Sequence, residues 1–210
     1  MYDDLICRGK SCISPEIALP YIEPKTNEMK KWLIGALVGA IILFAWQGTS
    51  WMVLQWHNDA TKYHPAQDSI MSYLSTQFKE EGSYLLPTVK PDASQSEHKE
   101  MMEKMKGNPW ATIIYHPSFE NDLTRIMIRG YLVDFFLVIC LIYMLSRGGW
   151  PTGRRIFAGS VTLGLLLFLY GPYNNHVWMH MPLSAIKGDL IDCLVSWTLC
   201  GAWLAWWLKR

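Results

Sequence analysis

Long uncharged runs dominate the pattern of hydrophobic and polar positions along this chain of 210 residues. From Trp32 to Trp56 there is no Asp, Glu, Lys, Arg or His. A helix of about 25 residues reaches roughly 37 Å, which exceeds the ~30 Å thickness of the hydrocarbon core of a bilayer. Three further apolar runs follow, at residues 130–146, 156–173 and 183–208. The pattern therefore predicts an all-α membrane protein built as a four-span transmembrane helix bundle.

The expected boundaries leave one long segment outside the membrane. Residues 1–28 have scattered proline, mixed charge and no periodicity, so we expect a disordered tail or an over-extended gene start there. The segment between the first two spans is expected to lie on the extracytoplasmic side. The four spans are expected at residues 29–56, 130–147, 155–173 and 183–208, and the extracytoplasmic segment at residues 57–129.

Positive charges fix the expected orientation. Seven Lys and Arg side chains lie at one end of the predicted spans: Lys30, Lys31, Arg147, Arg154, Arg155, Lys209 and Arg210. Positively charged short connections stay in the cytoplasm. We therefore expect a multi-pass protein of the bacterial cytoplasmic (inner) membrane, with both termini cytoplasmic and residues 57–129 outside. The formal net charge of +1 is close to zero, which argues against nucleic acid as the main partner.

The outer segment has a weaker pattern of its own. Asp68 is placed to cap a helix, Ser96 followed by Lys99 and Glu100 opens a second helix, and two short apolar stretches are typical of strands. The expected elements are a helix from 68 to 82, a strand at 84–86, a helix from 96 to 107 and a strand at 110–115. The sequence thus predicts a small α+β extracytoplasmic insertion between spans one and two.

Three acidic residues lie within or at the edge of the predicted spans, where a charge is costly. Asp189 and Asp192 are three residues apart and share one face of a helix. Asp134 lies toward the same end of the second span, and Lys187 and Arg129 are the expected counter-charges. We therefore expect an intramembrane polar cluster of Asp134, Lys187, Asp189 and Asp192. Ion pairs that hold spans two and four together are one interpretation; a proton- or cation-handling site and interfacial snorkelling are the others.

The histidines are candidate metal or haem ligands. All six map outside the membrane in this topology, and His176 and His180 are four residues apart, as two ligands on one helix face would be. Pro172 argues against a continuous helix there, and six scattered histidines are an ordinary number. We expect no bound cofactor and no metal site. If the chain does bind a metal ion, the candidate ligands are His57, His64, His176 and His180.

Small residues predict where helices approach closely. Gly35 and Gly39 form a Gly-xxx-Gly face on the first span. Packing within the bundle is the expected role of this face, and homodimerisation is the alternative.

Several stretches together resemble a family of small bacterial multi-pass membrane proteins with no assigned function. They are residues 45–57 (AWQGTSWMVLQWH), 82–87, 107–117 (GNPWATIIYHP), 129–135 (RGYLVDF) and 189–202. The likeness covers residues 29–210, with departures at Gln55, where a proline is expected, and at His116, where an arginine is expected. The resemblance implies an architecture and no activity.

No sequence motif indicates an enzyme. The chain has no phosphate-binding glycine loop, no Gly-x-Ser-x-Gly, no His-Glu-x-x-His, no Cys-x-x-Cys and no internal repeat. We therefore expect a non-enzymatic accessory or partner-binding membrane module. Its partners would be the lipid bilayer and a membrane protein or a second copy of the chain. The alternative is a metal-, haem- or proton-handling protein that uses the outer histidines and the intramembrane aspartates.

Overall fold

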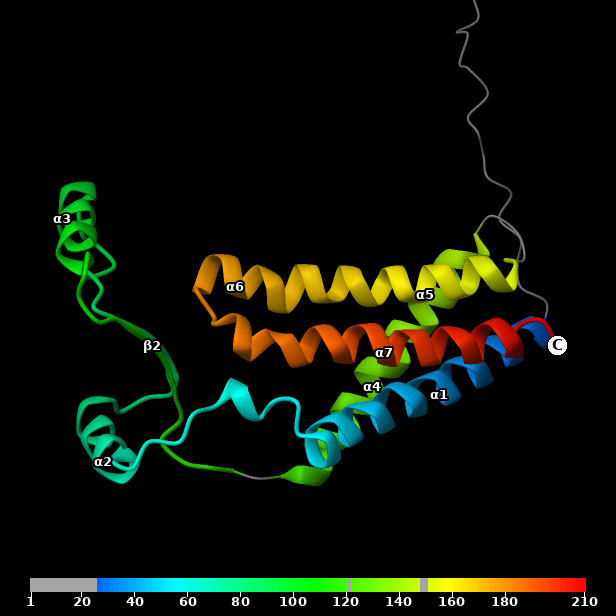
Figure 1. The fold of residues 1–210 in the computed structure, drawn as a ribbon, viewed down its shortest axis with the longest axis horizontal. Coiled ribbons are helices and arrows are strands. Elements are labelled where there is room, and N and C mark those ends of the chain that lie inside the picture. Colours follow the sequence, from blue (N-terminus) through cyan, green and yellow to red (C-terminus); the bar gives the residue numbers. More distant parts are fainter. Residues whose placement is uncertain (1–25, 121, 148–150) are drawn as a thin grey trace, which may run out of the picture. The chain divides into compact units, whose positions relative to one another are not determined.

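The computed structural model describes residues 26–120, 122–147 and 151–210 (Figure 1). Residues 1–25 of the expected 1–28 tail lie outside the described residues, and the first helix already includes Thr26. The elements are, in chain order, α1 (Thr26–Thr49), η1 (Ser50–Leu54), η2 (Asn58–Ala60), α2 (Gln67–Gln77), β1 (Gly82–Leu86), α3 (Gln95–Met105), β2 (Ala111–Tyr115), α4 (Leu123–Ser146), α5 (Gly153–Phe168), η3 (Leu169–Tyr173), α6 (Asn174–Met179) and α7 (Leu183–Trp207).

The chain divides into two compact units. The first, called the bundle below, holds the described residues up to Thr61 together with Thr124–Arg210 and therefore all the long helices. The second, called the insertion unit, is Lys62–Leu123 and contains the two strands with α2 and α3.

Four helical stretches of the described chain are long and apolar enough to cross a membrane. They are Asn27–Leu54, Leu123–Ser146, Gly153–Met179 and Leu183–Trp207. A small two-stranded sheet with its helices lies between the first and the second of them. The predicted fold class is therefore confirmed, and the length and composition of the four helices identify a multi-pass integral membrane protein.

Two helix boundaries differ from those expected. The second long helix begins at Leu123, before the expected start at Gly130, because residues 123–129 carry side chains that favour helix and Arg129 does not interrupt it. The third continues past Pro172, because a π-helical turn accommodates the missing backbone donor. It ends only at His180, whose φ of 52° is left-handed.

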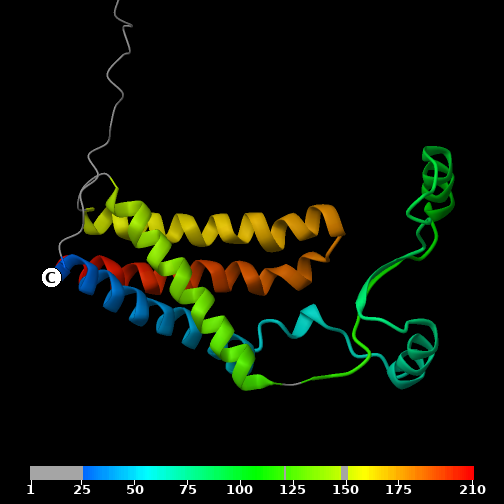
Figure 2. The same cartoon turned by 180° about the vertical axis from the view of Figure 1, so that it is seen from behind.

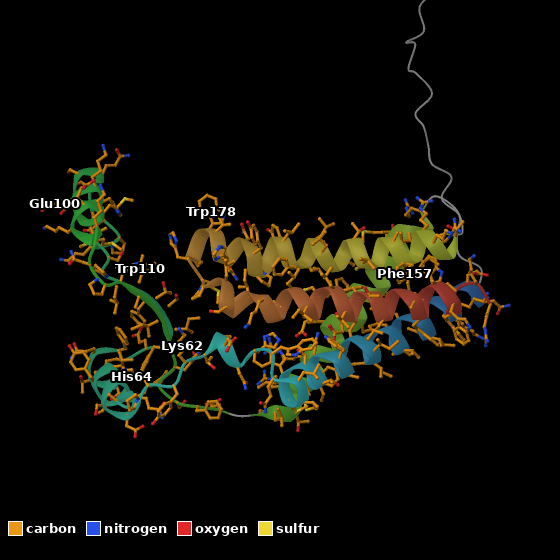
Figure 3. The ribbon with its side chains drawn as sticks, in the orientation of Figure 1. Lys62, His64, Glu100, Trp110, Phe157 and Trp178 are labelled. Atoms are coloured by element: carbon orange, nitrogen blue, oxygen red, sulfur yellow. The ribbon has the colours of Figure 1, made fainter. Side chains whose placement is uncertain are left out.

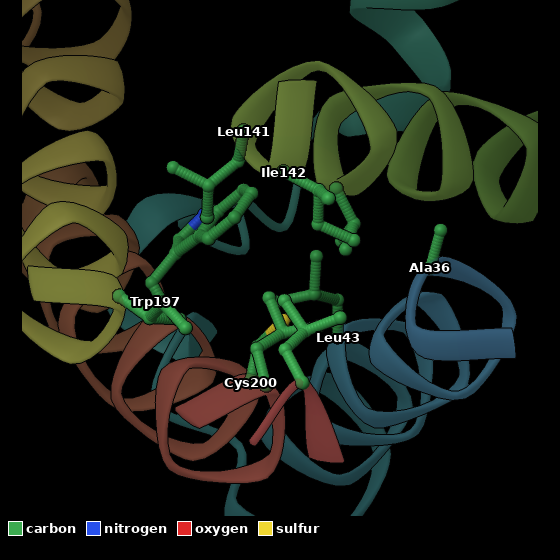
Figure 4. Close-up of a cluster of buried hydrophobic side chains, with 10 residues drawn as sticks. Ala36, Leu43, Leu141, Ile142, Trp197 and Cys200 are labelled. Carbon is green, nitrogen blue, oxygen red and sulfur yellow. The ribbon is translucent and has the colours of Figure 1, made fainter. Parts of the chain in front are cut away.

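The long helices of the bundle enclose one hydrophobic core. Both views show α5 and α7 side by side along their length, with α1 beside α7 (Figures 1 and 2). Figure 4 shows the centre of this core, where side chains from α1, α4 and α7 meet. The buried members are Ala36, Leu43, Val138, Leu141, Ile142, Ile156, Trp197, Cys200, Leu204 and Leu208.

The two glycines of the Gly-xxx-Gly face lie against neighbouring helices of the same bundle. A Cβ atom added at Gly35 would lie 3.1 Å from Cδ1 of Trp207 in α7. At Gly39 it would lie 3.0 Å from Cγ1 of Val138 in α4 and 3.2 Å from Sγ of Cys200 in α7. The face thus packs α1 against α4 and α7, and larger residues here would push the helices apart.

The insertion unit is organised around three aromatic rings. Strands β1 and β2 pair antiparallel, with Gly82 opposite Tyr115. Phe78 stacks on Tyr84 with ring centroids 4.1 Å apart and lies 5.4 Å from Tyr115. Tyr115 is the one buried residue of this unit within the part that the structure describes. The expected helix–strand–helix–strand order is present, but the unit has little core.

Helix α3 begins with a capping box. Ser94 Oγ accepts a hydrogen bond from the backbone N–H of Glu97, and the Glu97 carboxylate accepts one from the backbone N–H of Ser94. These hydrogen bonds from Ser94 hold the pKa of Glu97 below its ordinary value. The expected cap at Ser96 was therefore two residues too late, because only the Ser94–Glu97 spacing satisfies both backbone donors.

Candidate functional site

The polar residues expected inside the membrane lie toward one end of the bundle, where α1 ends and α4 and α7 begin, and they have different hydrogen-bond and ion-pair partners. Asp189 and Asp192 lie together on α7 and face His57. Lys187 forms an ion pair with Asp59. Asp134 on α4 contacts α1 separately, as described below.

A turn after the first span brings His57 to α7. Helix α1 passes into the π-helical turn η1, and Gln55 then adopts a left-handed conformation with φ of 54°. Such a conformation is strained for a residue with a side chain and persists where its surroundings hold it. Asn58 holds this one, because its side-chain Nδ2 donates to Oε1 of Gln55 at 3.1 Å and its backbone N donates to the Gln55 carbonyl at 3.1 Å.

The imidazole of His57 lies between two carboxylates. Its Nε2 is 2.8 Å from Oδ2 of Asp192, and its Nδ1 is 3.8 Å from Oδ1 of Asp189. The side chain is only 4% exposed. Trp46 Nε1 donates to Oδ1 of Asp192 at 3.0 Å, so both oxygens of this carboxylate have a partner. The contact therefore joins α1 and the turn after it to α7, and a protonated imidazole would balance one of the two carboxylate charges.

Two neighbours shape the space around this imidazole. The indole of Trp51 stacks on it with ring centroids 4.0 Å apart and an angle of 3° between the planes. On α7, a Cβ atom at Gly188 would lie 2.8 Å from Cε1 and Nδ1 of His57. Glycine is therefore required at position 188 for the ring to reach the aspartates. We call His57, Asp189 and Asp192 with Trp46 and Trp51 the His57 latch.

Asp134 is buried against α1, and only one of its two carboxylate oxygens accepts a hydrogen bond. Gln47 Nε2 donates to its Oδ1 at 3.2 Å. Its Oδ2 is buried and has no hydrogen-bond partner among the described residues, and the same holds for Oγ of Ser50. Arg129, an expected counter-charge, lines a groove of about 360 Å³ beside Asp134 but forms no ion pair within the described part of the chain.

The candidate metal ligands are not gathered. His176 lies in helix α6, whereas His180 is the left-handed residue that ends it, so the two do not share a helical face. His64 lies in the insertion unit, where its Nδ1 accepts from the backbone N of Ala66 at 3.2 Å. Across the described ranges no group of three or more His, Cys, Asp or Glu side chains could hold a metal ion. The two nitrogens of His57 face different carboxylates, so one ion could not use both pairs.

The residues that complete the site carried weak sequence signals. Trp46 and Trp51 belong to a tryptophan-rich stretch that indicates an interfacial aromatic belt, which gives no reason to expect a specific hydrogen bond. Gln47 is a polar side chain within an uncharged span, and such residues commonly bond to another helix, so it could have been matched with Asp134. Gly188 gave no signal of its own.

Comparison of the chain with protein-family models, with curated proteins and with solved structures finds no match. The resemblance of residues 29–210 to a family of small bacterial membrane proteins therefore stays a prediction.

Proposed function

We propose that the chain is a non-enzymatic membrane module that presents its insertion unit to a membrane-protein partner. We place it in the bacterial cytoplasmic membrane, with both termini in the cytoplasm and residues 57–129 outside. The basic residues at the other end of the bundle support this orientation.

The observation that carries this proposal is the apolar surface of the insertion unit. Only Tyr115 is buried among its described residues, while large apolar side chains are open to solvent. The most exposed are Phe119 at 90%, Tyr63 at 79%, Ile114 at 74% and Met102 at 68%. Such surface is typical of regions that bind another protein.

The contacts within the spans fit a structural role. The Trp46–Asp192 and Gln47–Asp134 hydrogen bonds join α1 to α7 and to α4, and the His57–Asp192 hydrogen bond joins the turn after α1 to α7. Polar groups used in this way fasten the bundle and fix the point where the chain leaves it for the insertion unit.

Site-specific photo-crosslinking in cells tests the proposal. A benzophenone side chain placed at Ile114 or Phe119 is expected to give one discrete crosslinked band of fixed mass. The matched control is the exposed polar position Lys99 in α3 of the same unit, which is expected to give none. Equal crosslinking from Lys99, or no product from either apolar position, would contradict partner binding through this surface.

Proton or cation handling is the second candidate, favoured by Oδ2 of Asp134 and Oγ of Ser50, which are buried without a hydrogen-bond partner among the described residues. If the protein conducts protons, proteoliposomes that contain it will dissipate an imposed pH gradient, and Asp134→Asn will abolish this while the exposed Asp68→Asn will not. A gradient that decays at the rate of empty vesicles would end this alternative.

A further inference from the structure

Six cationic side chains belong to the end of the bundle where α1 and α5 begin and the chain ends; five of them are exposed and Lys31 is half-buried. Figure 1 shows these helix ends, and Figure 3 adds the side chains. We call this set the basic collar: Lys30, Lys31, Arg154, Arg155, Lys209 and Arg210. Glu28, in the first turn of α1, is the acidic side chain of this end within the described residues. None of the six forms an ion pair with a carboxylate in that part of the chain. The collar is therefore a concentrated positive surface.

Tryptophan side chains form a layer next to the collar. Trp207 Nε1 donates to the carbonyl of Lys31 at 2.9 Å, and Trp203 Nε1 donates to the carbonyl of Gly35 at 3.3 Å. The guanidinium carbon of Arg210 lies 3.7 Å from the ring centroid of Trp206. Tryptophan is enriched at the depth of the lipid headgroups. Two of these rings are bonded to the backbone of α1, so tryptophan side chains that favour the headgroup region lie next to the cations of the collar.

We propose that the basic collar binds the phosphate headgroups of anionic phospholipids in the leaflet that it faces. Guanidinium groups bind phosphate through two parallel hydrogen bonds, and each Lys or Arg near an anionic surface strengthens binding by roughly fivefold. The apolar helices supply acyl-chain contact for any lipid, so the collar adds the preference for negative headgroups. This inference rests on the spanning helices alone and stands whether or not the insertion unit binds a partner.

Native mass spectrometry of the full chain tests the inference. The purified protein is exchanged into micelles with equal amounts of phosphatidylglycerol and phosphatidylcholine that carry identical dioleoyl chains. We expect at least tenfold more phosphatidylglycerol than phosphatidylcholine to stay bound. In the R154Q/R155Q/K209Q/R210Q variant we expect the preference for phosphatidylglycerol to fall by at least tenfold. Salt at 0.5 M should also weaken the preference of the wild-type chain, because it shortens the electrostatic screening length to about 3–5 Å.

Two matched variants separate charge in the collar from charge elsewhere. K62Q/K79Q/K90Q/K99Q removes the same charge from the insertion unit and is expected to keep the preference. R154K/R155K/R210K keeps the charge of the collar and is expected to keep at least half of the bound lipid. If the quadruple collar variant cannot be purified, the R154Q/R155Q pair should still reduce the preference several-fold.

Equal retention of the two lipids by the wild-type chain would overturn the inference. So would an equal loss in the insertion-unit variant, or full retention by the quadruple collar variant or the R154Q/R155Q pair. Displacement of the lipid by inorganic phosphate at millimolar concentration would assign the surface to a soluble anion and would also overturn it. The crosslinking experiment on the insertion unit is unaffected by any of these results.

Discussion

His57→Ala is expected to destabilise the bundle by about 3 kcal/mol, because it leaves the half-buried carboxylate of Asp192 without its histidine partner. In the wild-type chain Nε2 of His57 lies 2.8 Å from Oδ2 of Asp192, and the imidazole is almost completely buried. The alanine also leaves a gap beside Trp51 and Gly188. The measurement is reversible unfolding of the purified protein by SDS in mixed micelles, followed by tryptophan fluorescence.

A double-mutant cycle shows whether the loss of stability in His57→Ala comes from the unpaired carboxylate charge of Asp192. Asp192→Asn removes the charge but keeps an oxygen that can accept from Trp46, so the combination H57A/D192N should recover at least about 1 kcal/mol of the loss. His64→Ala, at an exposed histidine of the insertion unit, is the control and should change nothing. An unchanged unfolding midpoint for His57→Ala would show that the latch does not hold α1 to α7.

Gly164→Val is expected to cost about 3 kcal/mol or more, because it forces α5 and α7 apart. A Cβ atom at position 164 would lie 2.5 Å from the backbone oxygen of Cys193 and 2.8 Å from Cβ of Trp197. Neither atom can rotate away, so relief requires movement of a helix axis. Unfolding in SDS measures the cost, with Gly171→Ala as the control because no atom lies within 4 Å of a Cβ there.

The size of the added group provides a second check. Gly164→Ala already carries the clashing Cβ atom and should lose much of the stability that valine loses. Gly201 in α7 is equally close to α5, since a Cβ atom there would lie 2.6 Å from Cβ of Ser160. A Gly164→Ala protein as stable as the wild type would mean that α5 and α7 do not approach as closely as described.

The bundle could be predicted from sequence because its signals are local and strong. The uncharged run from Trp32 to Trp56 is long enough to span a bilayer, and the three-residue spacing of Asp189 and Asp192 places both on one helix face. The insertion unit was predicted in outline from its turn and capping residues. Its exact helix start was missed, although the Ser94-x-x-Glu97 spacing is a capping-box pattern that distinguishes Ser94 from Ser96, which has Lys99 three residues on.

The partners of the polar residues could not be predicted because they are set by contacts between distant parts of the chain. His57 reaches α7 only through the left-handed turn at Gln55, which no local pattern requires. Lys187 was expected near the aspartates of its own helix, yet it pairs with Asp59 after the first span. The π-helical turn at Pro172 was also missed, because proline ordinarily ends a helix.

We expect the four apolar helices to cross a bilayer, with the insertion unit on one side of it and the basic collar on the other. Labelling with a membrane-impermeant maleimide tests this arrangement most directly, using Ser94→Cys or Lys209→Cys in a chain whose Cys7 and Cys12 are serine. In intact spheroplasts we predict labelling of Ser94→Cys at once and of Lys209→Cys only after lysis. Equal labelling of both before lysis, or recovery of the chain in a detergent-free high-speed supernatant, would show that the helices do not cross the membrane in this way.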